Sequence, residues 1–181
     1  GGMFGWVLML GMARAADAAV ELGELTVEAS AEGAVAAAQA ALAAGRFDES
    51  ASLYRALAEA GGGWPARLAE AVSWYEVGNL NEARKAAEAA VALAPSEPAA
   101  LNMLGLLYSD SGELPRGIEL LEKAKAAARS QGRKATEARV AVNLALARVD
   151  QGNAIAAAAE AASALKLATE VGDAELIATA R

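Results

Sequence analysis

Four glycines recur along this chain at nearly equal intervals, and this recurrence limits the fold more than any other feature of the sequence. Gly45, Gly78, Gly112 and Gly152 stand in similar surroundings, and their three spacings of 33, 34 and 40 residues are those of a two-helix repeat. Each glycine lies where one helical pattern ends and another begins, a position that suits the left-handed backbone conformation. A period of about 34 residues that holds two helices is typical of a helix–turn–helix solenoid. The sequence therefore predicts an all-α chain.

The residues around the third glycine sharpen this prediction. Leu104, Gly105 and Tyr108 form a Leu-Gly-x-x-Tyr pattern, and Gly117 and Ala124 follow at two positions that need small side chains. A bulky side chain where helices cross would cost about 1–3 kcal/mol by overpacking. With the turn glycines placed at the same position of each repeat, the chain resembles the tetratricopeptide repeat (TPR) family from about Ala31 to Gly172. The other repeats match less fully, through Ala38, Ala41, Ser50, Tyr54 and Leu57 in the first, Ala71, Trp74, Ala83, Ala90 and Pro95 in the second, and Asn143, Leu144, Ala145, Ala157 and Ala164 in the fourth.

The resemblance implies a right-handed superhelical solenoid of antiparallel helix pairs. We assign it to residues 33–181, with about four repeats and the start of a fifth. The wider spacing between Gly112 and Gly152 returns between Gly132 and Gly172, which predicts longer helices and resembles the extended TPR type. Because no polar capping helix follows, we expect a fragment truncated at the C-terminus, and at the N-terminus too.

Composition excludes several kinds of site. The 181 residues include 16 Lys and Arg against 23 Asp and Glu, a net charge of −7, which argues against nucleic-acid binding. The chain has no cysteine, and therefore no disulfide, iron–sulfur cluster, thiolate zinc site or cysteine nucleophile. It also has no histidine, the usual general base and commonest metal ligand. We therefore expect no catalytic residues, no metal and no cofactor.

Residues 1–18 read as a signal-peptide-like segment. The run from Met3 to Met12 is apolar and uncharged, too short for a stable membrane span but suited to the short apolar core of a secretory signal. Ala13-Arg14-Ala15 then offers a small-x-small cleavage site and Ala16-Asp17-Ala18 a second one, although no basic residue precedes the run. The alternative is a first amphipathic helix that docks on the domain. The first reading predicts a periplasmic or otherwise exported bacterial protein, and the second a cytoplasmic one.

Residues 19–32 read as an extended linker. Apolar Leu25 and Val27 alternate with polar Glu24, Thr26 and Glu28, a period of two that favours a strand. A single strand is not stable alone. The segment either pairs with a partner or is a plain linker.

The TPR resemblance implies a concave surface lined by the first helix of each pair, where partners lie as extended peptides or helices. The carboxylate clamp of chaperone-binding members is absent, because no lysine falls at an inner position. An apolar groove with acidic spots suits an amphipathic or basic helix better, although some apolar positions could instead be packing between repeats. The candidate partner-binding residues are Tyr75, Asn102, Leu106, Arg139, Val142 and Leu146, with Val149 and Asp150 at further inner positions.

These features favour a non-catalytic scaffold that binds a peptide or helical segment of a protein partner in its groove, in a bacterial envelope assembly. The alternative is a TPR regulatory or sensor arm of a larger cytosolic protein. Neither of these two hypotheses excludes self-association.

A basic run either complements a helix dipole or docks an acidic partner, and it comprises Lys123, Lys125, Arg129, Arg133 and Lys134.

Overall fold

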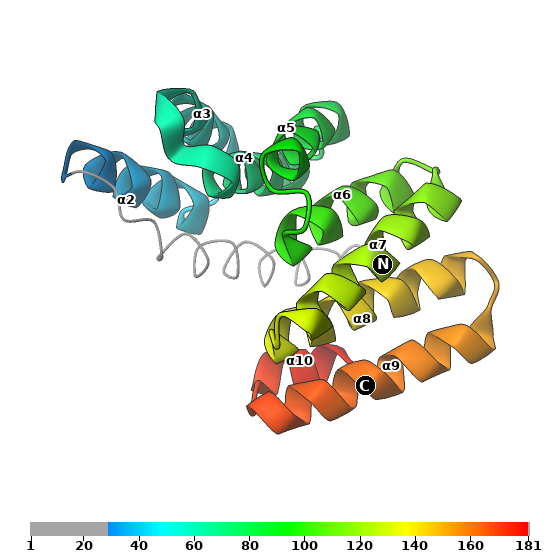
Figure 1. Ribbon diagram of the computed structural model, residues 1–181. Coiled ribbons are helices and arrows are strands. Elements are labelled where there is room, and N and C mark those ends of the chain that lie inside the picture. The colour runs from blue at the N-terminus through cyan, green and yellow to red at the C-terminus, as the bar shows by residue number, and fades with distance from the viewer. Residues whose placement is uncertain (1–28, 181) are drawn as a thin grey trace. The chain divides into compact units, whose positions relative to one another are not determined.

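The computed structural model describes residues 29–180, which form helices and the turns that join them (Figure 1). The expected leader at 1–18 lies outside the described residues, as does the expected linker up to residue 28. The first helix of the described residues begins at Ala29, so residues 29–32 are helical where an extended linker was expected. Alanines and the acidic Glu32 in the first turn favour this earlier start.

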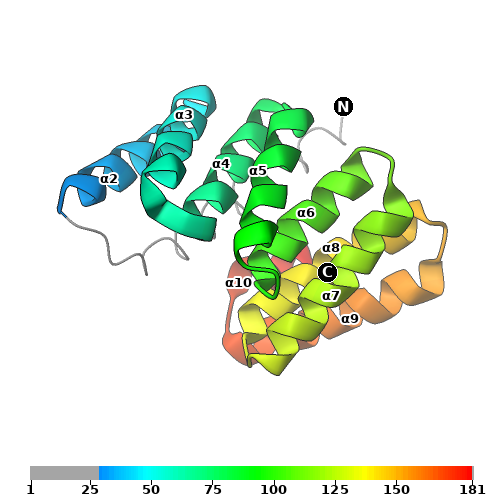
Figure 2. The ribbon, with the colours of Figure 1, turned by 45° about the horizontal axis from the view of Figure 1, so that its top comes forward.

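The chain divides into two compact units, with the boundary between Leu93 and Ala94. In the first unit α2 packs on α3, α3 on α4, and α4 on α5, and the helices form two antiparallel pairs (Figure 2). Its elements are α2 (Ala29–Ala43), α3 (Phe47–Leu57), the kinked connecting segment η1 (Ala58–Gly62), α4 (Gly63–Val77) and α5 (Leu80–Leu93).

The second unit repeats this arrangement. α6 pairs with α7 and α8 with α9, while α7 also packs on α8 and α10 lies against α9 and α8 (Figure 1). Because α6 and α8 touch as well, the first helices of the two pairs are neighbours. The elements are α6 (Pro98–Asp110), α7 (Leu114–Ser130), α8 (Lys134–Asp150), α9 (Ala154–Val171) and α10 (Ala174–Thr179). The predicted all-α fold of antiparallel helix pairs is confirmed.

The four recurring glycines lie in the turn within each helix pair, and their φ angles range from 72° to 85°. At Gly112 the glycine N–H donates to the carbonyl of Ser109 and the N–H of Glu113 donates to that of Tyr108, which closes α6. A residue with a Cβ atom is strained at such a φ, so these turns need glycine.

The helices between Gly112 and Gly172 are the longer ones that the wider glycine spacing predicts. α7, α8 and α9 contain 17, 17 and 18 residues, whereas α4, α5 and α6 contain 15, 14 and 13. A difference of about three residues is close to one helical turn.

Small residues lie where α6 and α7 cross. A Cβ atom on Gly105 would lie 2.9 Å from Leu121 Cγ and 3.0 Å from the carbonyl oxygen of Gly117. Tyr108 and Ala124 of the same pattern are buried beside them. The predicted crossing positions of the other pairs are buried as well, among them Ala38, Ala41, Ser50, Tyr54, Ala71, Ala83, Ala90, Ala157 and Ala164.

Candidate functional site

Five of the six predicted binding residues lie on two neighbouring helices of the second unit. α6 carries Asn102 and Leu106, and α8 carries Arg139, Val142 and Leu146. Leu106 and Val142 are buried, Asn102 and Arg139 are partly exposed, and Leu146 is 44% exposed. Leu106 is therefore a core residue, and Leu146 is the apolar residue of the five that solvent reaches most.

Asn102 is held by a second amide. Nδ2 of Asn143 on α8 donates a hydrogen bond of 2.8 Å to Oδ1 of Asn102. Asn143 is only 3% exposed, so this bond satisfies a polar group that water hardly reaches. Asn102 thus joins α6 to α8, and replacing it would disturb the packing of the helices together with any binding surface.

Tyr75, the sixth predicted residue, lies on α4 in the first unit and is partly exposed. Its carbonyl accepts the N–H of Gly78 and so helps to end α4. Tyr75 is therefore a candidate binding residue of the first unit alone, separate from the five residues on α6 and α8.

An apolar hollow of about 290 Å³ lies beside Leu146, between α8, α9 and the end of α10. Val149 in its wall is 60% exposed, more than Leu146. The lining residues are Val142, Ala145, Leu146 and Val149 from α8, Ala157, Ala158 and Ala161 from α9, and Thr179 and Ala180 at the end of α10.

Among the described residues that line this hollow, no side chain carries a charge, and Thr179 is the one polar member. Exposed branched apolar side chains next to such a hollow are the kind of surface that binds other apolar side chains. The repeat pattern predicts that Val142, Leu146 and Val149 lie at inner positions of the first helix of their pair, and all three line this hollow. It did not point to the alanines of α9, because alanine occurs at 52 of the 181 positions and single alanines carry little signal.

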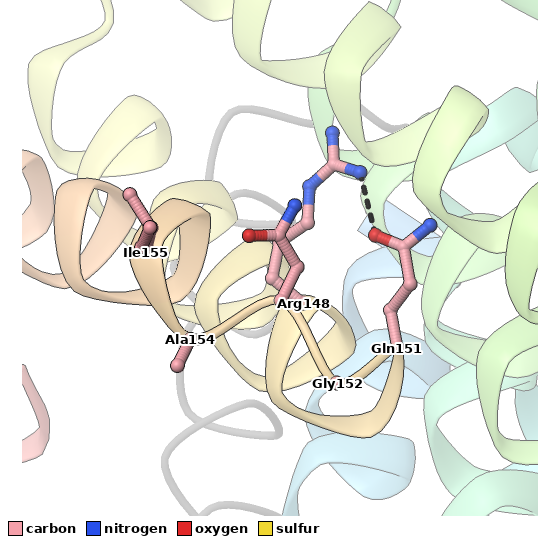
Figure 3. A pocket seen from close by; sticks show the side chains of 6 residues that line it. Arg148, Gln151, Gly152, Ala154 and Ile155 are labelled. Carbon is pink, nitrogen blue, oxygen red and sulfur yellow. Dashed lines mark hydrogen bonds between the residues drawn. The ribbon is translucent and has the colours of Figure 1, made fainter.

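A second, open hollow of about 580 Å³ lies at the turn between α8 and α9 (Figure 3). Its polar groups already have partners. Arg148 donates to Gln151 at 2.9 Å and to Glu122, and Asn153 accepts the N–H of Ala156 at the start of α9. Ile155 lies apart from these groups on the first turn of α9, and the polar part of this hollow is better explained by local structure than by a ligand.

The basic run is engaged in ion pairs within the second unit. Its members pair as Lys123–Glu119, Lys125–Glu160, Arg129–Glu137, Arg133–Glu97 and Lys134–Glu170. The pairs to Glu137, Glu160 and Glu170 join different helices, and the pair of Arg133 with Glu97 joins the residues that directly precede α8 and α6. These cations therefore serve the packing of helices, which weakens the case for an acidic docking partner.

Within residues 29–180 no helix combines the length and hydropathy that crossing a bilayer requires. The same residues contain no cluster of three or more carboxylates that could hold a metal ion.

Comparison with known proteins supports the fold. No protein-family model matches this chain, and no curated protein matches it. A crystal structure of MamA matches with a TM-score of 0.60 and 17% identity, over 79% of this chain and 87% of that one. A structure described as MamA MSR-1 C2 matches with a TM-score of 0.54 and 19% identity, over 78% and 88%. MamA is a TPR-like helical solenoid, and at these identities the likeness establishes the fold alone.

Proposed function

We propose that this chain, with its TPR-like fold, is a non-catalytic scaffold that binds a segment of a partner protein. In this proposal the first helices of the second unit carry the binding surface. The observation that carries the proposal is the uncharged hollow next to the exposed Leu146 and Val149 of α8. Asn102 on α6 and Arg139 on α8 are partly exposed polar residues of the first helices, outside the lining of this hollow. An apolar centre with a polar margin is the usual composition of a protein interface.

Photo-crosslinking tests this surface directly. A photoreactive amino acid replaces Leu146 in the full chain, and a control chain carries it at Lys123, an exposed position on α7. In an extract of the source cells we expect one discrete protein crosslinked from position 146 and competed by unlabelled chain. Equal labelling from both positions would contradict the proposed surface.

The identified partner is then purified and titrated with variants of the surface. We expect Arg139→Glu combined with Leu146→Lys to weaken binding at least tenfold, because the pair reverses one charge and places another at the hollow. Asn102 is left unchanged because its side chain bonds the buried Asn143. Unchanged affinity in a variant with the wild-type circular dichroism spectrum would exclude these helices as the binding surface.

We also propose that the protein acts outside the cytoplasm, in a bacterial envelope assembly. The support is the uncharged run from Met3 to Met12 followed by Ala13-Arg14-Ala15. The intact mass of the gene product from separated envelope and cytosolic fractions tests this. A mature form that begins at Ala16 or Ala19 is expected. An uncleaved cytosolic form would favour the regulatory arm of a cytosolic protein.

A further inference from the structure

We propose that the turn between α7 and α8, residues 131–133, acts as a clamp on the segment that joins the two units, residues 94–97. When the clamp is closed, it holds this segment against the second unit. When it is open, the segment is free to bend and the two units can move as separate bodies. The inference goes beyond the proposed function, because neither the turn nor the segment lines the hollow beside α8.

Two side chains of the turn bind consecutive residues of the joining segment. Nε2 of Gln131 donates to the carbonyl oxygen of Ser96 at 3.0 Å. The guanidinium of Arg133 donates to Oε1 of Glu97 at 2.5 Å. The bonded residues are 35 and 36 positions apart, about one repeat, so the turn that follows the pair of α6 and α7 holds the segment that precedes the same pair. Two bonds fix the direction of the segment as well as its position.

Glu97 also caps α6 with the same carboxylate oxygen. Oε1 accepts the N–H of Ala99 at 3.1 Å, in the first turn of the helix. The positive end of the helix dipole favours a carboxylate at this place. The side chain of Glu97 is only 13% exposed, so water supplies little of its solvation, and Arg133 supplies the charge that compensates it. Opening the clamp should therefore loosen the start of α6 together with the joining segment.

The ion pair makes the clamp sensitive to salt. The side chain of Arg133 is 30% exposed, so ions of the solvent reach it. The Debye length falls from about 10 Å at 0.1 M salt to about 3 Å at 1 M, which weakens such a pair. Within the segment the N–H of Glu97 donates to the carbonyl of Ala94, and this bond curves the segment without attaching it to a helix. We therefore expect high salt to open the clamp.

Amide hydrogen exchange and limited subtilisin digestion of the full chain test this inference. Arg133→Gln should raise the exchange rate of residues 96–101, and the rate of the first cut within residues 93–97, at least threefold. The side chain of Arg133 does not cap α8, so this variant keeps the cap of that helix unchanged. Gln131→Ala should raise both rates less, because it removes an uncharged bond. Lys134→Met is the matched control, since this neighbouring cation pairs with Glu170 on α9.

A double variant distinguishes one clamp from two independent effects. Glu97→Gln keeps an oxygen for the cap but loses the charge, and it should exchange as fast as Arg133→Gln. The two substitutions together should be no faster than either alone, because both break the same ion pair. In 1 M NaCl the exchange rate of the wild type should approach that of Arg133→Gln, and the rate of the variant should change little.

The inference is overturned if Lys134→Met accelerates exchange as much as Arg133→Gln, if the effects multiply in the double variant, or if 1 M NaCl leaves the wild type unchanged. Exchange around Leu121 in the core of α7 should stay at the wild-type rate. Faster exchange there as well would make Arg133 a general stabiliser of the second unit rather than a clamp. None of these outcomes bears on crosslinking from position 146, so the proposed function is tested separately.

Discussion

At Gly117 the backbones of α6 and α7 approach so closely that a side chain has no room. A Cβ atom there would lie 2.7 Å from the carbonyl oxygen of Gly105 and 2.8 Å from the backbone nitrogen of Ser109. Both are backbone atoms, so they move only if the helices separate. We expect Gly117→Ala to lower the free energy of unfolding by about 1–3 kcal/mol, measured by urea denaturation followed by circular dichroism.

Gly33→Ala is the matched control for this prediction. Gly33 lies inside α2, and a Cβ atom there would meet nothing within 4 Å. Because alanine favours a helix over glycine by roughly 0.5–1 kcal/mol, this substitution should leave stability equal or slightly higher. A similar loss from both substitutions would show that crowding at the α6–α7 crossing is not the cause.

Tyr54 is a second residue whose surroundings matter, because burial changes the pKa of its hydroxyl. Its side chain is fully buried, its hydroxyl bonds to no described residue, and burial raises its pKa from 10.0 to about 12. Between these values the unfolded chain has lost the proton while the folded chain keeps it. The contribution of the Tyr54 hydroxyl to the free energy of unfolding is therefore fully present below pH 10 and is lost as the pH rises toward 12.

We expect Tyr54→Phe to remove that part of the fall in stability between pH 10 and 12. At pH 7 the variant should be as stable as the wild type or more so, because it no longer buries an unpaired hydroxyl. Urea denaturation at pH 7, 10 and 11.5 checks both statements. Tyr75→Phe keeps Tyr54 and should keep the wild-type pH dependence, and an identical pH dependence in both variants would contradict the assignment.

At the scale of the elements, one arginine joins three helices of the first unit. Arg55 on α3 donates to Glu70 on α4 at 2.6 Å and to Glu82 on α5 at 2.7 Å. Its guanidinium also lies over the ring of Trp74, 5.5 Å from the centroid. Glu70 is only 1% exposed, and Arg67 is its second cationic partner.

Replacing Arg55 should therefore loosen these helices. We expect Arg55→Met to lower the free energy of unfolding by about 1–3 kcal/mol. The buried carboxylate of Glu70 then has one cationic partner, Arg67, instead of two. Arg46→Met removes an exposed pair with Glu49 and should cost less than about 1 kcal/mol. Urea denaturation followed by tryptophan fluorescence measures both, and equal effects would mean that burial of Glu70 adds nothing.

The contacts of Arg55 with other helices were not predictable from the sequence, whereas the helices themselves were. Turn glycines and small crossing residues act within one helix pair, so their spacing along the chain reports their role. The contacts of Arg55 span 15 and 27 residues and depend on how three helices are rotated about their axes. The partners of the basic run and the bond between Asn102 and Asn143 depend on the same rotations.

The candidate site was also predictable only in part: its positions on α8 were, but the exposure of each side chain was not. The inner-helix register gives Val142, Leu146 and Val149 the same face of α8, and they line one hollow. The register does not distinguish Leu106, which is buried, from Leu146, which is exposed, since exposure depends on what packs above each position. The wall that α9 contributes is made of alanine, which also fills the buried crossings, so its type alone does not reveal a surface.

At the scale of the whole molecule, the division between Leu93 and Ala94 separates two sets of packed helices. The joining segment includes Pro95 and Ser96, which are exposed, and Leu93 before it is 60% exposed. Such a segment is a preferred site of proteolysis. We expect limited subtilisin digestion of the full chain to cut first within residues 93–97 and to leave two fragments that resist further cleavage.

The fragment of residues 94–181 should then keep its helical circular dichroism and melt cooperatively, because α6 to α10 bury their own core. Leu104, Leu107, Leu121 and Leu144 belong to that core and are at most 6% exposed. Gly117→Ala should lower the melting temperature of this fragment, since the crossing of α6 and α7 lies within it. If the fragment melts without a transition, the second unit needs the first to fold, and the helix pairs then act as one cooperative array of the kind that repeat proteins form.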